Sequence, residues 1–225
     1  MITFKANMVA IELTRRCNMA CGHCMRGDPQ PIDLDPAYLG PFFRQIDFID
    51  TLVLSGGEPS LVPEIITAVK QALNDACTKV YSLEIVTNGK VVSVPFINAL
   101  ATLDIASTYN LAYGGIYHEE VPKVNIKRLK NNLCPKWTVH PQGIHGKFLS
   151  KQGRSKEGTE PDLYSPFLIS TLHSTYVTGR PVYLNAEGFI VPHCDLSYEN
   201  QAKHIMCRAD ESIFDAVVAF NTRVE

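Results

Sequence analysis

The chain has 225 residues, 45% of them hydrophobic and 20% charged, which is an ordinary composition for a single soluble globular domain with a buried core. Its 21 basic and 23 acidic residues give a formal net charge of -2, so the overall charge does not favour a nucleic-acid or membrane surface. No apolar run predicts a membrane span, and the first residues lack a signal-peptide pattern. The seven cysteines do not suit a secreted disulfide framework, so we expect a cytoplasmic protein.

Strands and helices are predicted to alternate through the first half of the chain. Short apolar runs predict four strands, over residues 8–13, 51–54, 80–86 and 103–107. Proline at the helix starts and apolar residues at helical spacing predict three helices, over residues 35–48, 63–73 and 95–100. The crossovers are long enough for parallel pairing, so this rhythm predicts an α/β fold with a parallel sheet and ligand sites at the carboxyl ends of its strands.

The pattern is weaker beyond residue 110. It predicts a helix over 121–131, a strand over 137–139, a loop over 143–161, a hairpin with strands at 182–184 and 189–191, and a last helix over 212–220. We expect a core over residues 1–145. A smaller irregular extension over residues 146–225 would carry the hairpin and the terminal helix and pack on that core.

Three cysteines lie on one short predicted loop, at Cys17, Cys21 and Cys24. Thiolates are the soft ligands that an iron–sulfur cluster selects, and three of them leave one iron open for a substrate or cofactor. We expect Arg15 and Arg16 to lower the pKa of these thiols and so favour the thiolate form. The alternative is a zinc site, with His23 or the distant Cys194 or Cys207 as the fourth ligand.

The CxxxCxxC spacing after a first strand resembles the signature of the radical S-adenosylmethionine (SAM) superfamily. His23 stands where that family often has an aromatic residue, which is a mild departure. The resemblance continues after the second strand in Ser55-Gly56-Gly57-Glu58-Pro59, after the third in Thr87-Asn88-Gly89, and in the fourth strand as Leu103-Asp104-Ile105-Ala106-Ser107. It covers roughly residues 7 to 108.

The resemblance implies that residues 1–145 form a partial (β/α) barrel. It also implies a [4Fe–4S] cluster held by Cys17, Cys21 and Cys24, with SAM bound to the fourth iron. An electron from a flavodoxin- or ferredoxin-type donor would then cleave SAM into methionine and a 5′-deoxyadenosyl radical that abstracts hydrogen from a substrate. The cofactor would carry this chemistry, while the protein supplies binding and geometry.

Five further residues would bind SAM if the resemblance holds. Gly56 and Gly57 would let the backbone approach its methionine part, and Glu58 would accept from its ammonium group, although a carboxylate here can also cap the next helix. Asn88 is either a contact near SAM or part of a tight Asn-Gly turn. Ser107 could reach the ribose, or could simply fill a hydrogen bond at a strand end.

The segment from Asn185 to Cys194 resembles the hairpin that begins the auxiliary-cluster extension, SPASM or twitch, of peptide-modifying members. Only Cys194 and Cys207 follow residue 180, with Cys134 upstream, so we expect no second cluster and a degenerate remnant that shapes the substrate pocket. A zinc site that includes His193 and His204 is the alternative.

The expected substrate is a carbon of a peptide or protein. A small or nucleotide-derived molecule is an alternative substrate, and activation of a partner's glycine by a radical is an alternative reaction. A zinc-binding module without catalysis is the alternative from a different class.

Overall fold

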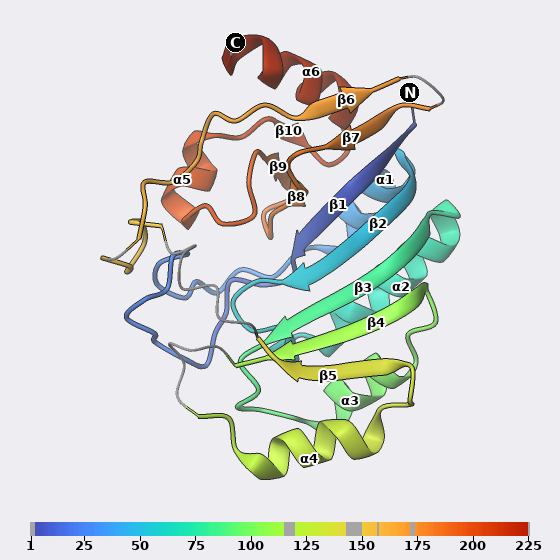
Figure 1. Ribbon diagram of the computed structural model, residues 1–225, viewed down its shortest axis with the longest axis vertical. Helices are drawn as coiled ribbons and strands as arrows, with labels where there is room; N and C mark the ends of the chain where they lie inside the picture. The colour runs from blue at the N-terminus through green and yellow to red at the C-terminus, as the bar shows by residue number, and fades with distance from the viewer. Residues whose placement is uncertain (1–2, 115–119, 143–149, 157, 172–173, 225) are drawn as a thin grey trace.

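A single open sheet dominates the computed structural model, which describes residues 3–114, 120–142, 150–156, 158–171 and 174–224 (Figure 1). In the described part of the chain the sheet has ten strands, in the order β10-β9-β8-β1-β2-β3-β4-β5, and β7 also pairs with β1 and with β6. The strands of the first half pair in parallel and in chain order: β1 (Phe4–Glu12), β2 (Ile46–Ser55), β3 (Lys79–Thr87), β4 (Ala106–Tyr113) and β5 (Trp137–Pro141). Because β5 and β10 are at opposite ends of this order, the sheet does not close.

The helices of the first half are α1 (Leu39–Phe43), α2 (Pro63–Ala76), α3 (Val94–Ala101) and α4 (Lys123–Asn132). In Figure 1, α1 and α2 lie behind the strands, and α3 and α4 lie beyond β5 at the bottom of the picture. Short 3-10 turns, η1 (Pro36–Tyr38) and η2 (Pro59–Leu61), precede α1 and α2. The main core includes fully buried Leu52, Leu83 and Leu111 from the strands and Ile66 and Phe96 from the helices. This is the alternation that the sequence predicts, with the sheet covered on one face by crossover helices.

The C-terminal segment extends the same sheet past β1. It contains β6 (Leu168–Ser170), β7 (Tyr176–Thr178), β8 (Val182–Leu184), β9 (Phe189–Val191), α5 (Tyr198–Lys203), β10 (Cys207–Arg208) and α6 (Ile213–Val224). The predicted hairpin is confirmed, because β8 and β9 pair antiparallel. The sequence did not indicate that β7 and β8 would pair in parallel with β1. The predicted boundary between residues 145 and 146 lies outside the described residues.

Several predicted elements have different bounds in the structure: β1 and β2 begin four and five residues earlier than predicted, and the first helix and the fourth strand differ more. The first helix was predicted to reach residue 48, but α1 ends at Phe43, and the side chain of Gln45 donates to the Pro41 carbonyl 3.2 Å away. The apolar residues that follow, starting at Ile46, belong to β2 instead. The fourth strand was predicted over 103–107, but β4 begins at Ala106, because Leu103 still closes the end of α3 by donating to the Leu100 carbonyl. No helix of the described residues is long and apolar enough to cross a membrane.

Helix α2 ends on a residue in the left-handed conformation, Cys77, with φ 57° and ψ 23°. Such a position costs an L-residue about 1–2 kcal/mol and favours glycine. We expect Cys77→Gly to raise the free energy of unfolding by about 1 kcal/mol, measured as a higher urea midpoint. The control is Gln71→Gly on the exposed face of the same helix, which should lower the free energy of unfolding by about 1 kcal/mol. A lower midpoint for Cys77→Gly would contradict the left-handed cap.

Candidate active site

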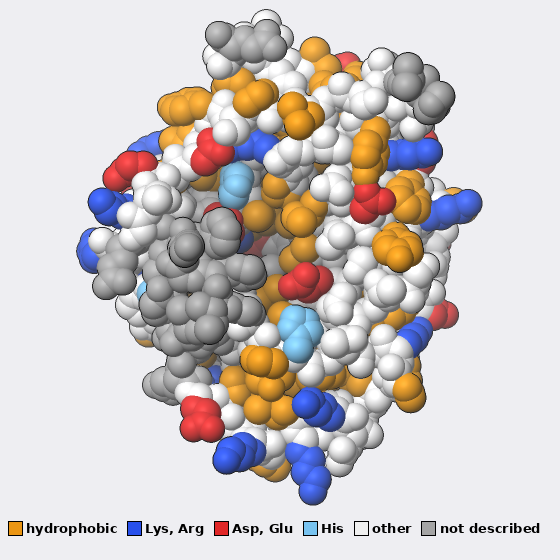
Figure 2. Space-filling model, in the orientation of Figure 1, with side chains coloured by type: hydrophobic (Ala, Val, Ile, Leu, Met, Phe, Trp, Pro, Cys, Tyr) orange, Lys and Arg blue, Asp and Glu red, His pale blue; other side chains and the backbone are white. Residues whose placement is uncertain are grey.

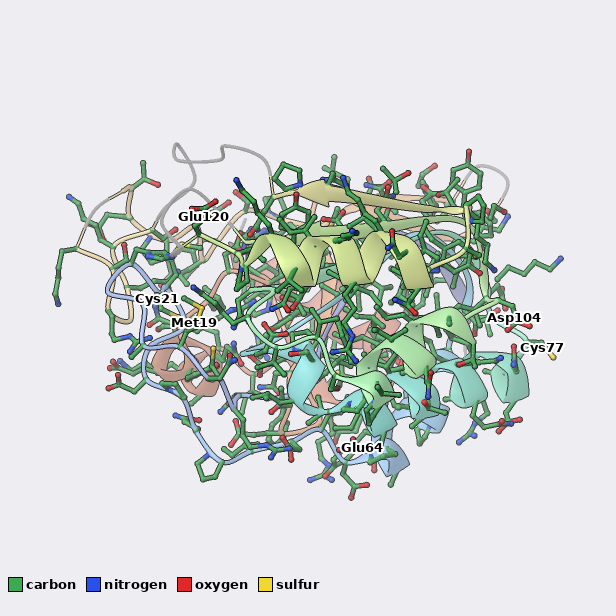
Figure 3. All side chains as sticks on the ribbon, turned by 90° about the horizontal axis from the view of Figure 1, so that it is seen from below. Met19, Cys21, Glu64, Cys77, Asp104 and Glu120 are labelled. Carbon is green, nitrogen blue, oxygen red and sulfur yellow. The ribbon has the colours of Figure 1, made fainter. Side chains whose placement is uncertain are left out.

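The three cysteines of the predicted cluster lie on the loop that follows β1, and all three are partly buried. The backbone N–H of Cys24 donates to the carbonyl of Cys21 at 3.1 Å, which closes the second half of the loop as a turn. Figure 3 places Cys21 and Met19 at one end of the molecule and Cys77 and Asp104 at the opposite end. The cysteine loop therefore lies at the carboxyl ends of the strands, as the sequence predicts.

The spacing of the sulfur atoms tests what these cysteines could hold. Among the described residues, the one group of three potential ligands with atoms all within 4.8 Å of one another is His193, Cys194 and Asp195. At least two of the three loop sulfurs are therefore more than 4.8 Å apart, which is wider than around a single zinc ion, where Zn–S bonds of about 2.3 Å bring the ligand sulfurs within about 4 Å. Three separated thiols on one loop suit an iron–sulfur cluster, in which each sulfur binds a different iron.

The expectation that Arg15 and Arg16 lower the thiol pKa is wrong for Cys17. Burial raises the pKa of the Cys17 thiol, and the nearby Glu58 carboxylate and the other two thiols raise it further. Both arginines instead form ion pairs with carboxylates: the Nε of Arg15 lies 3.1 Å from the Glu12 carboxylate, and the Nε of Arg16 lies 2.8 Å from the Asp33 carboxylate. At Cys17, the effect of burial on the thiol pKa therefore outweighs any stabilisation of the thiolate by these two guanidinium groups.

Gly56 and Gly57, which follow β2, lie where the backbone of this loop closely approaches the backbone of residues 14–16. The N–H of Gly57 donates to the carbonyl of Thr14 at 2.7 Å, and the N–H of Glu58 donates to the carbonyl of Arg16 at 2.9 Å. A Cβ on Gly57 would clash with that Arg16 oxygen and stand 2.7 Å from its carbonyl carbon. Gly56 has φ +139°, and its Cβ would clash with the carbonyl of Thr14. These glycines thus let the second loop attach to the start of the cysteine loop, and their contact with SAM stays a prediction.

The Glu58 side chain is fully buried and joins three segments. One carboxylate oxygen accepts from the N–H of Ser60 at 2.9 Å and from the hydroxyl of Thr87 at 2.6 Å, and the other accepts from the N–H of Asn88 at 2.7 Å. The first of these bonds caps η2, which is the alternative role that the sequence left open. A carboxylate offers about four acceptor positions, so three donors leave room for one more, such as an ammonium group.

Asn88 reaches the cysteine loop directly. Its side-chain amide donates to the Asn18 side chain at 2.7 Å and lies 3.9 Å from the sulfur of Cys17. Its amide oxygen accepts from the N–H of Lys90 at 2.9 Å, so Asn88 also shapes the turn after β3. Both predicted roles are compatible in one side chain: the turn positions Asn88 beside the first cysteine.

Ser107 does not lie at this site. The prediction placed it at the carboxyl end of the fourth strand, but it is the second residue of β4, which continues to Tyr113. Its neighbour Thr108 pairs with Ser82 near the start of β3, whereas Thr87 at the end of β3 pairs with Tyr113. Ser107 is therefore exposed close to the opposite edge of the sheet, and its proposed contact with the ribose is not supported.

A buried polar network that sequence reasoning missed lies beside the cysteine loop. Glu12 accepts from the Tyr183 hydroxyl at 3.0 Å, the Ala186 N–H at 3.0 Å and the Gln201 amide at 3.4 Å, besides its ion pair with Arg15. Burial raises the pKa of the Tyr183 hydroxyl well above its ordinary value, which keeps it a donor. The only signal in the sequence was a glutamate inside an apolar strand.

The four residues of the alternative zinc site, His193, Cys194, His204 and Cys207, do not all come together in the described part of the chain. His193 and Cys194 lie together with Asp195, with potential ligand atoms within 4.8 Å of one another, and burial raises the pKa of the Cys194 thiol to about 12. Cys207 lies in β10, opposite Ile190 of β9. The ring of His204 instead lies 2.9 Å from the carbonyl of its own helix at Asn200. Among the described residues, the four predicted ligands thus do not converge.

Comparisons with known proteins support the fold and the cysteine loop. A family model described as the radical SAM superfamily matches residues 11–129, more than half of the chain. The structure is similar to native anSMEcpe with bound AdoMet and Cp18Cys peptide, with a TM-score of 0.64 and 9% identity, covering 98% of this chain and 82% of that one. Hexahistidine-tagged anSMEcpe with bound AdoMet matches with a TM-score of 0.61 and 10% sequence identity, and the match covers 97% of this chain and 82% of that one.

Streptococcus suis SuiB bound to S-adenosylmethionine matches with a TM-score of 0.46 and 11% identity, covering 99% of this chain and 67% of that one. No curated protein matches the sequence. At identities of about one residue in ten, these matches concern the fold. The anSMEcpe matches confirm the predicted class, an α/β chain with a parallel, open sheet of the partial-barrel type.

Proposed function

Because this chain is an enzyme that belongs to the radical SAM superfamily, we propose that it modifies a carbon of a peptide or protein substrate. The observation that carries the proposal is the joining of three loops at one edge of the sheet. The cysteine loop, the Gly56–Glu58 segment and Asn88 are tied together by backbone and side-chain hydrogen bonds. The cofactors of this family are a [4Fe–4S] cluster and SAM, and when bound they supply the 5′-deoxyadenosyl radical that abstracts hydrogen from the substrate.

The residues of the site would divide the work of binding these groups. Cys17, Cys21 and Cys24 would hold the cluster. Glu58 keeps one acceptor position for the ammonium group of SAM, in a fully buried setting where a charge-assisted bond is strong. Asn88 would hold the first turn of the cysteine loop in place through Asn18. Gly57 would fix the distance between the loop and Glu58.

Two observations support a peptide or protein as the substrate. The structure with the TM-score of 0.64 is described with a bound peptide, and its likeness covers 98% of this chain. The face of the sheet opposite the helices also carries a row of three polar side chains, Glu84, Asn110 and Thr138, which the backbone donors and acceptors of a peptide could meet. We include a flavodoxin- or ferredoxin-type electron donor and a cytoplasmic location in the proposal, since a reduced cluster needs a reducing partner.

Anaerobic reconstitution with iron and sulfide tests the radical mechanism. We expect a brown protein with about four irons per chain, and 5′-deoxyadenosine on addition of dithionite and SAM. About eight irons would instead support an auxiliary cluster in the C-terminal segment. Tightly bound zinc, without a cluster and without 5′-deoxyadenosine, would contradict the proposal and leave a zinc-binding module.

A further inference from the structure

The face of the sheet that points away from α1–α4 is hollowed and carries polar side chains. Figure 2 shows this face, with hydrophobic side chains lining the hollow and an acidic and a histidine side chain near its middle. Side chains alternate between the two faces of a strand. Leu83 and Ile85 are fully buried in the core under the helices, so the side chain of Glu84 between them points to the hollowed face.

Cross-strand pairing identifies the neighbours of Glu84. Val53 of β2 and Asn110 of β4 are its partners, and Thr138 of β5 is the partner of Asn110. Val53 packs with Ala10 and Tyr183, in a cluster separate from the main core, which confirms that this row lies on the face away from the helices. The row therefore presents a carboxylate, an amide and a hydroxyl side by side.

Glu84 is the one acidic, lysine or arginine side chain on this face between Ile49 of β2 and His140 of β5. The other positions on that stretch of the face are uncharged except for the titratable His140: Ile49, Thr51, Val53, Ser55, Val80, Ser82, Val86, Ala106, Thr108, Asn110, Ala112 and Thr138. In the part of the chain that the structure describes, Glu84 makes no hydrogen bond or ion pair, although it is partly buried. A half-buried charge between low-dielectric walls attracts a counter-charge more strongly than an exposed one.

A cation lies farther along the same row, over Tyr183, the partner of Ala10. The guanidinium of Arg26 lies over the Tyr183 ring, 5.1 Å from its centre. Tyr183 is in β8, three strands away from β3 in the sheet order. Burial acts to lower the pKa of Arg26, but its neighbours Tyr183, Glu12 and Asp195 raise it above its ordinary value, so Arg26 is matched by acidic groups on the β8 side of the sheet. The negative charge of Glu84 is therefore available to a ligand.

We propose that Glu84 is a specificity-determining residue that binds a cationic group of the substrate, the ammonium or guanidinium of a lysine or arginine side chain. This rests on the proposed function, since the hollowed face leads to the edge where Glu58 and Asn88 lie. Glu84 is three residues before Thr87, the strand residue that bonds Glu58. That separation is about 10 Å, so Glu84 anchors a part of the substrate remote from the reacting carbon.

A binding experiment tests the proposal on the reconstituted protein. The probes are two fluorescein-labelled mixtures of synthetic 12-residue peptides, one with a central lysine and one with a central acetyl-lysine, compared by fluorescence anisotropy. We expect the wild type to bind the lysine mixture about tenfold more tightly, in the range of a partly desolvated ion pair. Glu84→Gln should remove this preference, and Glu84→Lys should transfer it to a mixture with a central glutamate.

The matched control is Glu64→Gln. Glu64 lies in the first turn of α2, on the helix side of the sheet in Figure 3, and this variant should keep the wild-type preference. If spermidine at an equal concentration of amine groups displaces the lysine peptides, the natural ligand of Glu84 is a small amine and not a peptide side chain. Equal affinity of the wild type for both mixtures, with no binding of spermidine, would overturn the role of Glu84. The role of Glu84 would also be overturned if the Glu84→Gln variant kept the wild-type preference for the lysine peptides. The proposed function fails separately, if the wild type forms no 5′-deoxyadenosine from SAM.

Discussion

Replacing Gly57 with alanine is expected to abolish reductive cleavage of SAM and to reduce bound iron to the level of a Cys21→Ala variant. The added Cβ would clash with the carbonyl oxygen of Arg16, one residue before the first cysteine. Backbone cannot yield as a flexible side chain does, so the two backbone bonds from residues 57 and 58 to the cysteine loop would break. The measurements are iron per chain after anaerobic reconstitution and 5′-deoxyadenosine formed with dithionite and SAM.

A second glycine provides the control for this substitution. The Cβ of Gly40→Ala would stand 3.3 Å from the Arg44 guanidinium, the mobile end of a long side chain at the end of α1. We expect this variant to bind iron and form 5′-deoxyadenosine as the wild type does. Wild-type iron and activity in Gly57→Ala would show that the close approach of the two loops is not what holds the cysteine loop in place.

The sequence predicted the site where local pattern and topology agree. Parallel strands place their carboxyl ends at one edge, so loops that follow three successive strands must meet there. This reasoning placed Glu58 and Asn88 near the cysteines, and the structure joins all three segments through hydrogen bonds. It could not tell that Glu58 would use three of its acceptor positions within the protein.

The misplacement of Ser107 has a local cause. The run from Leu103 to Ser107 combines apolar and small residues, and a short apolar run cannot be assigned to a strand by periodicity alone. In the structure Leu103 is buried as the closing turn of α3, and Asp104 is exposed and pairs with Lys70 of α2 at 2.9 Å. Because the strand starts later than predicted, the residues at its carboxyl end are Ala112 and Tyr113.

Contacts between distant segments were beyond sequence reasoning. Glu12 and Tyr183 are 171 residues apart, and Arg15 and Gln201 are 186 apart. The local sequence around each of these residues indicates only an apolar strand, a loop or a short helix, and no distant partner. The parallel pairing of β8 with β1 brings Glu12 and Tyr183 together, and a parallel pair between such remote strands leaves no short-range turn signal.

Glu12→Ala is expected to lower the free energy of unfolding by about 3–5 kcal/mol, the usual cost of removing one partner from a buried ion pair. Glu12 and Arg15 are both almost fully buried, at 0% and 3% exposure. The substitution also leaves the Tyr183 hydroxyl and the Ala186 N–H without their acceptor, and unpaired buried donors carry a further cost. Urea denaturation of the protein before reconstitution measures the loss without a contribution from bound cofactor.

An exposed ion pair on α5 serves as the comparison for Glu12. Glu199 and Lys203 lie 2.6 Å apart, but both side chains are more than half exposed, so Glu199→Ala should destabilise the protein far less than Glu12→Ala. Glu12→Gln keeps an acceptor oxygen without the charge and should fall between the two alanine variants. A loss below about 1 kcal/mol for Glu12→Ala would mean that Glu187, which also pairs with Arg15 at 2.8 Å, is enough to hold the guanidinium. A large loss would instead make Glu12 the residue that fastens the cysteine loop to the C-terminal hairpin.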